Sequence, residues 1–114
     1  MKQDALSMTL LYDYYGELLT EKQKTCFDLH YNQDLSLGEI AQEAGISRQG
    51  VHDTLMRAEA LLRNMEEKTG CIARDRRTQS ALAEICEAAA ELANDPHASE
   101  LARRILDAAE RIKE

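Results

Sequence analysis

The sequence is poor in the residues that build β-sheets and sharp turns. Among its 114 residues there is no tryptophan, one proline and one valine, and aromatic residues make up 4%. Leucine and alanine, by contrast, supply 15 and 16 residues. Because leucine and alanine favour helices whereas β-branched residues favour strands, this balance excludes a sheet-based fold. We therefore expect an all-α protein, with the length of one domain and a helical annex.

Basic residues are also scarce. Lysine and arginine number 14 against 21 aspartates and glutamates, which gives a net charge of -7. A protein that binds nucleic acid non-specifically neutralises phosphates with surplus basic side chains, so this charge excludes a histone-like or polybasic binder. Any binding to DNA must then come from a local patch.

Several kinds of site and segment are missing as well. The three cysteines, Cys26, Cys71 and Cys86, form no CxxC and have no histidine at metal-ligand spacing, so we expect reduced thiols, no metal and no cofactor. No run of 18 apolar residues occurs and the N-terminus lacks the features of a signal peptide, which predicts a cytoplasmic protein without membrane insertion. No catalytic triad or carboxylate pair stands out, so we expect no enzyme.

The N-terminal half shows clear helix starts and one clear stop. Residues 4–19 form a predicted amphipathic helix with apolar residues at steps of four, Leu6, Leu10, Tyr14 and Leu18, and with Leu11 and Tyr15 beside them. Thr20 and Gln23 make a capping box that begins a second helix, which should end near residue 32. Ser36 and Glu39 make another capping box, and Gly45 stops the short helix that follows.

The C-terminal half predicts three further helices. One long helix runs from Arg48 to Gly70, with a seam of Val51, Leu55, Ala58, Leu62 and Met65. After a soft joint at 69–75, a helix over 81–93 carries the stripe Leu82, Ile85, Ala89 and Leu92. Pro96 begins the last helix, with Asp95 as its cap and a seam of Ala98, Leu101, Ile105, Ala108 and Ile112. These seams either pack within one chain or form a homodimer.

Residues 37–52 have the pattern of a helix-turn-helix. Ala41 is small enough for a second helix to cross closely above it, and Gly45 allows the positive φ of a tight turn. Val51, with Ile40, Ala44 and Ile46, completes a small apolar core. Together with the serines that cap both helices, this spacing favours a helix-turn-helix over an ordinary tight corner between helices.

Residues 6–68 resemble a known family. This part of the chain resembles region 4 of bacterial primary sigma factors. The residues that carry the resemblance are Leu19-Thr20, Gln23, Leu29, Tyr31, Leu35-Ser36, Glu39-Ile40-Ala41, Gly45-Ile46-Ser47-Arg48 and Ala58. With Tyr12-Asp13-Tyr14-Tyr15 added, the chain resembles the small bacterial YlxM family. That resemblance implies a sigma-region-4-like helix-turn-helix. It also implies a regulatory role in the signal recognition particle pathway, because the genes of the family commonly lie beside that of the particle's GTPase.

The start of the long helix supplies the candidate DNA-reading residues. A recognition helix places its N-terminal residues in the major groove, which here indicates Ser47, Arg48, Gln49, His52, Asp53, Met56 and Arg57. Residues 36–65 carry four acidic and three basic residues, a net charge of -1. Because so few basic residues bind phosphates weakly at physiological salt, DNA binding would need a dimer to double their number.

Two functions therefore stay open. The first is a dimeric DNA-binding regulator, with residues 1–70 as the helix-turn-helix domain and 71–114 as a C-terminal helical hairpin that dimerises. The second is a module that binds no DNA and instead contacts a protein or the RNA of the signal recognition particle.

Overall fold

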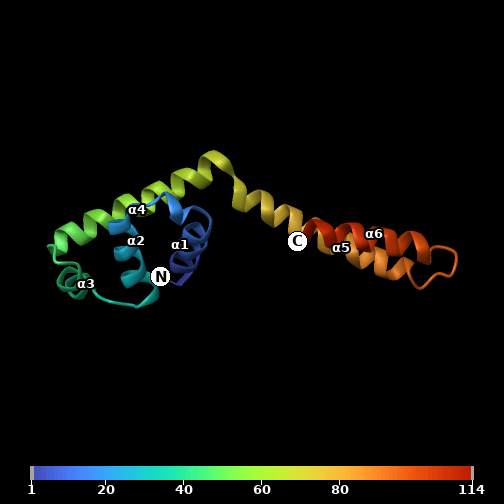
Figure 1. Ribbon diagram of the computed structural model, residues 1–114, viewed down its shortest axis with the longest axis horizontal. Coiled ribbons are helices and arrows are strands. Elements are labelled where there is room, and N and C mark those ends of the chain that lie inside the picture. Colours follow the sequence, from blue (N-terminus) through green and yellow to red (C-terminus); the bar gives the residue numbers. More distant parts are fainter. Residues whose placement is uncertain (1, 114) are drawn as a thin grey trace. The chain divides into compact units, whose positions relative to one another are not determined.

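The computed structural model describes the backbone of residues 2–113 and the side chains of residues 5–113. Helices dominate this part of the chain and no strand occurs in it, as the all-α prediction requires. The chain divides into two compact units, one up to Ile72 and one from Ala73 onward. In order, the elements are α1 (Lys2–Tyr15), η1 (Gly16–Leu18), α2 (Glu21–Phe27), η2 (Asp28–Asn32), α3 (Leu37–Ala44), α4 (Arg48–Thr69), α5 (Cys71–Leu92) and α6 (Ser99–Lys113) (Figure 1).

Helix α1 buries only part of the apolar surface that the sequence predicted. The exposed side chains include Leu6 (72%), Leu18 (55%) and Tyr14 (41%), whereas Met8, Leu11, Tyr15 and Leu19 are buried. The prediction is wrong at Leu6, Tyr14 and Leu18, whereas Leu11 and Tyr15 are buried as expected. Met8, Leu11 and Tyr15 are spaced by three and four residues, which keeps them on one side of the helix.

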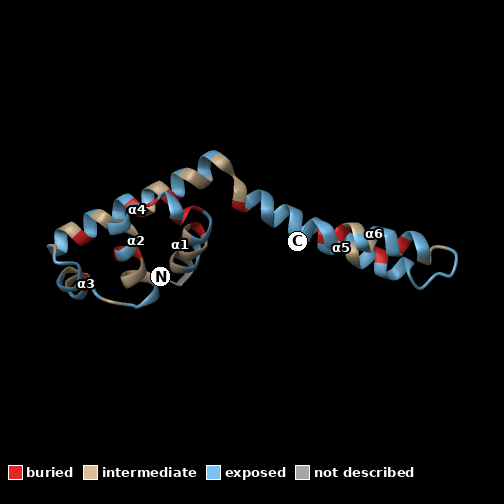
Figure 2. Ribbon diagram, in the orientation of Figure 1, coloured by how far each residue is buried: buried red, intermediate tan, exposed pale blue. Residues whose placement is uncertain are grey.

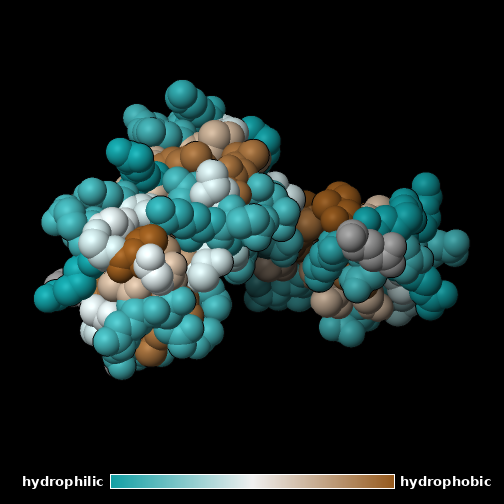
Figure 3. Space-filling view, turned by 60° about the vertical axis from the view of Figure 1, so that its left-hand side comes forward, coloured by the Kyte–Doolittle hydropathy of each residue, from teal (hydrophilic) through white to brown (hydrophobic). Residues whose placement is uncertain are grey.

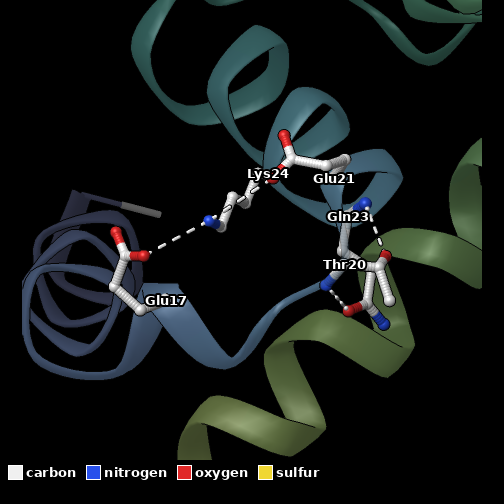
Figure 4. Close-up of polar contacts among 5 residues, drawn as sticks. All are labelled: Glu17, Thr20, Glu21, Gln23 and Lys24. Atoms are coloured by element: carbon white, nitrogen blue, oxygen red, sulfur yellow. Dashed lines mark hydrogen bonds and ion pairs between the residues drawn. The ribbon is translucent and has the colours of Figure 1, made fainter.

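The entry into α2 follows the predicted capping box (Figure 4). The Thr20 hydroxyl accepts a hydrogen bond from the backbone N–H of Gln23, and the Gln23 side chain accepts one from the N–H of Thr20. Nearby, the Lys24 ammonium lies 3.6 Å from a Glu17 carboxylate oxygen and 3.7 Å from a Glu21 carboxylate oxygen. These contacts link η1 to α2 and fix the direction in which α2 leaves the turn.

The second predicted helix is regular only as far as Phe27. Beyond it, η2 is a π-helical turn, closed by a hydrogen bond from the Gln33 N–H to the Asp28 carbonyl. Cys26 and Phe27 are fully buried just before it, and Tyr31 within it stacks near Phe27 with ring centroids 4.4 Å apart. The wider turn therefore keeps Tyr31 against the core.

Helix α4 is the long helix that the sequence predicted, from the Ser47 cap to Gly70 at φ 64°. Its seam lies inside the first unit: Val51, Leu55, Ala58 and Leu62 are buried against α1, α2 and α3, and Met65 is half-buried beside them (Figure 2). Of the two alternatives for this seam, packing within one chain is therefore the one that the structure shows. The short helices α1, α2 and α3 bury apolar side chains against it.

The second unit consists of most of α5, a turn and α6. Leu82 and Ala89 of α5 and Ala102 and Ala109 of α6 are buried, so the two helices pack through one leucine and three alanines. Three expectations need correction. Helix α5 begins at Cys71, so the joint between α4 and α5 consists of Gly70 alone. Helix α6 begins at Ser99, because residues 93–98 form a turn that contains Pro96. Five residues of the predicted stripes are exposed: Ile85, Leu92, Leu101, Ile105 and Ile112.

Candidate nucleic-acid interface

A three-residue turn joins α3 to α4. Gly45 adopts a left-handed conformation at φ 71°, and its N–H and that of Ile46 both donate to the Ala41 carbonyl. Only glycine takes this conformation without steric cost, which is why the chain reverses so sharply here. Ser47 then caps α4 by accepting a hydrogen bond from the N–H of Gly50. The predicted helix-turn-helix is confirmed.

A small core beneath the turn fixes the angle between α3 and α4. Cys26 and Ile40 are completely buried, together with Val51 and Leu55 on α4, while Ile46 packs at the edge of this cluster. Ala44, expected in the core, is exposed instead. Because α2, α3 and α4 all contribute to one core, the start of α4 is held rigidly by its buried side.

The opposite side of α4 carries the candidate reading residues. All seven side chains are exposed: Ser47, Arg48, Gln49, His52, Asp53, Met56 and Arg57. Met56 is a large apolar side chain and is nevertheless 53% exposed. The structure thus separates the buried seam of α4 from an exposed face, within its first three turns, that suits contact with another molecule.

Asp53 organises the polar groups on this face. Its carboxylate accepts a hydrogen bond of 3.0 Å from the Gln49 amide and lies 3.7 Å from Nδ1 of His52. The Gln49 amide is therefore already oriented in the absence of a ligand. A glutamine so placed has the donor and acceptor that match adenine in the major groove, whereas the carboxylate repels phosphate.

A shallow hollow of about 440 Å³ lies between the first turns of α3 and α4. It is lined by Leu37, Arg48, Gln49 and His52. Sequence reasoning missed Leu37, although its position directly after the Ser36 cap places it at the start of α3. An apolar side chain beside Arg48 and Gln49 offers a surface for a thymine methyl group.

Helix α3 brings negative charge close to this face. The backbone and side chain of Ser36 both hydrogen-bond the Glu39 carboxylate, which lowers the pKa of Glu39. Glu39, Gln42 and Glu43 also line a second hollow together with Leu35. The Glu39 carboxylate accepts a hydrogen bond from the N–H of Ser36, and the Ser36 hydroxyl accepts one from the N–H of Glu39, so neither N–H is free for an incoming phosphate.

Other kinds of site find no support within the described part of the chain. No group of three histidine, cysteine or acidic side chains there is arranged to hold a metal ion. Within the same residues, the helices are too short or too polar to cross a membrane.

Together, the turn at Gly45, the core beneath it and the exposed start of α4 define a helix-turn-helix protein. Residues 2–101 match the model of the family described as "Putative helix-turn-helix protein, YlxM / p13 like", UPF0122. The chain belongs to this family, as its sequence resemblance indicated.

Relatives in several bacteria support this assignment. A UPF0122 protein of Thermoanaerobacter sp. (strain X514) is 52% identical over 85 residues, which cover 75% of this chain and 73% of the relative. One of Desulforamulus reducens is 50% identical over 78 residues, or 68% of this chain and 67% of the relative. One of Bacillus cereus (strain AH187) is 36% identical over 112 residues and covers 98% of this chain and 99% of the relative.

Proposed function

We propose that this protein is a DNA-binding regulator of the cytoplasm, not an enzyme, that reads DNA with the exposed start of α4. The observation that carries the proposal is the division of α4 into a seam buried against α2 and α3 and a polar face that begins at its capped N-terminus. A recognition helix needs this division, because its scaffold must hold one side while the other enters the major groove.

Each candidate residue has a role in this proposal. Arg48 binds guanine or a phosphate, and Gln49 binds adenine. Ser47, His52 and Arg57 contact the phosphate backbone, while Met56 lies against a base edge. Asp53 holds Gln49 in place and accepts from cytosine N4 where the site presents one.

Charge makes a dimer part of the proposal. The reading module of residues 36–65 has a net charge of -1, and two of its four acidic residues, Glu39 and Glu43, lie on α3. Each phosphate contact contributes about 0.9 to the slope of log affinity against log salt, so one copy with three basic residues binds weakly. Two copies double the number of contacts and read an inverted repeat.

The test is selection of duplex DNA from a random pool, at low and at physiological salt. The expected result is an inverted repeat that the wild type enriches and that the variant Arg48→Ala with Gln49→Ala does not enrich. A matched control is Arg63→Ala with Asn64→Ala, which removes the same charge from exposed positions farther along α4. Failure of the wild type to retain any DNA at low salt would overturn the proposal.

A second candidate is interaction with a protein or the RNA of the signal recognition particle. The hollow lined by Leu35, Glu39, Gln42 and Glu43 favours the protein partner, because an acidic surface suits a basic protein better than DNA or RNA. Affinity capture from native lysate with the wild type and a Glu39→Gln, Glu43→Gln variant tests this candidate. Capture of a particle component by the wild type alone would support it, and capture of none would contradict it.

A further inference from the structure

The segment that contains the first turns of α5 is the most basic part of the chain. Between Glu67 and Glu84 the sequence has four basic residues and one acidic residue: Lys68, Arg74, Arg76, Arg77 and Asp75. Their net charge is +3, whereas the whole chain has a net charge of -7. Positive charge is therefore concentrated in one short segment of an acidic protein, and none of these residues belongs to the reading face of α4.

Every side of α5 is exposed within this segment. The eight consecutive residues 73–80 are all exposed, and they form more than two helical turns (Figure 2). A helix that packs on a core has a buried side, as α5 has farther along, where Leu82 and Ala89 are buried. Residues 73–80 have no such side, so a partner molecule can reach this part of the helix from any direction.

Two arginines of this segment lie on either side of two small residues. At about 100° per residue, Ala73 and Ser80 lie close to one line along the helix. Arg76 lies about 50° to one side of this line and Arg77 about 50° to the other. Asp75 lies about 150° from the line, on the opposite side of the helix. We call the side formed by Ala73, Arg76, Arg77 and Ser80 the arginine face.

The arginine face is not neutralised by acidic residues of its own helix. Arg76 and Arg77 are exposed, and no ion pair within the described residues involves either of them. Glu84 is the next acidic residue along the chain on the same side. It lies seven residues beyond Arg77, which is about 10 Å along the helix axis. Both guanidinium groups are therefore available to bind an anion.

The chemistry of the arginine face fits phosphate groups. An arginine guanidinium presents its N–H donors in a planar fork that binds two phosphate oxygens at once. Ala73 and Ser80 are small, so the helix can approach a phosphate backbone closely, and the Ser80 hydroxyl supplies one more donor. Hydrophilic side chains cover most of the visible surface of both units (Figure 3). The sign of its charge, rather than hydrophilicity alone, therefore sets this face apart.

We propose that the arginine face binds the phosphate backbone of duplex DNA, whatever the sequence of that DNA. This inference rests on the proposed function and supplies what the reading module lacks, because residues 36–65 have a net charge of -1 and attract phosphates weakly. Duplex DNA carries one negative charge per about 1.7 Å of its axis, so several phosphates lie within reach of both arginines. Helix α4 then selects the sequence, and α5 adds sequence-independent attraction.

The experiment measures the affinity of the full chain for a non-specific DNA duplex by fluorescence anisotropy at several salt concentrations. Each phosphate contact contributes about 0.9 to the slope of log affinity against log salt. Arg76→Gln with Arg77→Gln should therefore reduce the slope by about 1.8. Arg76→Lys with Arg77→Lys keeps both charges and should keep most of the slope. Circular dichroism checks that each variant keeps its helices.

Arg103→Gln with Arg104→Gln is the matched control, because it removes two charges from adjacent exposed arginines of α6. This control should leave the slope near the wild-type value. An equal loss of slope in the control would overturn the inference, because the overall charge rather than the arginine face would then set the affinity. A wild-type slope in the variant Arg76→Gln with Arg77→Gln would overturn it as well.

Selection of DNA from a random pool separates this inference from the proposed function. A wild type that enriches no sequence, but loses slope on replacement of Arg76 and Arg77 by glutamine, would overturn the reading role of α4 and support the arginine face. A wild type that enriches an inverted repeat, but keeps its slope after that replacement, would do the reverse. A wild type that binds no duplex at low salt would overturn both.

Discussion

The phenolic oxygen of Tyr15 lies 2.6 Å from Oε1 of Glu66, although 51 positions separate the two residues in the chain. The same carboxylate oxygen accepts a hydrogen bond of 3.0 Å from the N–H of Ile72. Thr69 Oγ1 also lies 2.6 Å from the Tyr15 oxygen and donates to it, because the single phenolic hydrogen is used for Glu66. One tyrosine thus ties α1 to the end of α4 and to the first turn of α5.

Replacement of Tyr15 by phenylalanine should lower the free energy of unfolding. The ring stays buried, but Glu66 and Thr69 both lose a hydrogen-bond partner at a half-buried site. Chemical denaturation measures the change. Tyr12→Phe, which keeps the ring stacked on Phe27, is the matched control and should cost less. Equal stability of the two variants would contradict the role given to the Tyr15 hydroxyl.

The wild type and Tyr15→Phe should also differ in how their stability depends on alkaline pH. Burial, and next the hydrogen bond to Glu66, raise the pKa of Tyr15 above its usual value. The folded state therefore favours the protonated phenol, and this contribution is complete below pH about 10 and is lost as the pH rises further. The stability difference between the wild type and Tyr15→Phe should accordingly shrink above that pH. A difference that grows there would be the contrary result.

Two glycines of the helix-turn-helix should respond differently to replacement by alanine: Gly45 in the turn and Gly38 within α3. Gly45→Ala places a side chain at φ 71° and should cost about 1 kcal/mol, although the space around it is open. Gly38→Ala lies within α3, where a new Cβ meets Arg48 at 3.9 Å, and should stabilise by about 0.5 kcal/mol. Thermal unfolding of both variants measures the contrast. A tolerated Gly45→Ala would show that the left-handed turn is not required.

The three thiols should react at different rates. Burial raises the pKa of Cys26, so its reactive thiolate is rarer than in a free cysteine, and the side chain is inaccessible. Cys71 and Cys86 are half-buried. An aromatic disulfide reagent followed by peptide mapping should therefore label Cys71 or Cys86 first and Cys26 only on unfolding. Early labelling of Cys26 in the folded chain would contradict the packing of the core beneath α4.

Asp53 should limit the affinity for DNA. Asp53→Asn removes a negative charge from the reading face but keeps an oxygen for Gln49. A repulsion of about 1 kcal/mol between unit charges in water corresponds to about a fivefold gain in affinity for non-specific duplex. Fluorescence anisotropy at two salt concentrations measures it, and Asp13→Asn, a change of the same kind on exposed α1, is the control. Weaker binding of non-specific duplex by Asp53→Asn would contradict the repulsion assigned to this carboxylate.

Helix starts and stops were predictable because their causes are local. Thr20 and Ser36 find their partners three residues away, and Gly45 and Gly70 act through their own φ angles. The same holds for the turn of the helix-turn-helix, whose spacing identified the exposed start of α4 as a candidate reading face. Leu37 was missed there because its closeness to Arg48 depends on how α3 crosses α4.

What the sequence by itself determined is therefore the all-α class, the order of the helices, the helix-turn-helix and the family. The tertiary structure alone decided which parts of the predicted apolar faces of α1, α5 and α6 are buried. It placed Met8 rather than Leu6 in the core, enclosed the seam of α4 within one unit, and left Ile85 and Ile105 exposed on the hairpin. Tyr15 and Glu66 likewise meet only in the folded chain. The physical reason is range: a cap or turn depends on neighbours in sequence, whereas burial depends on surfaces that distant segments supply.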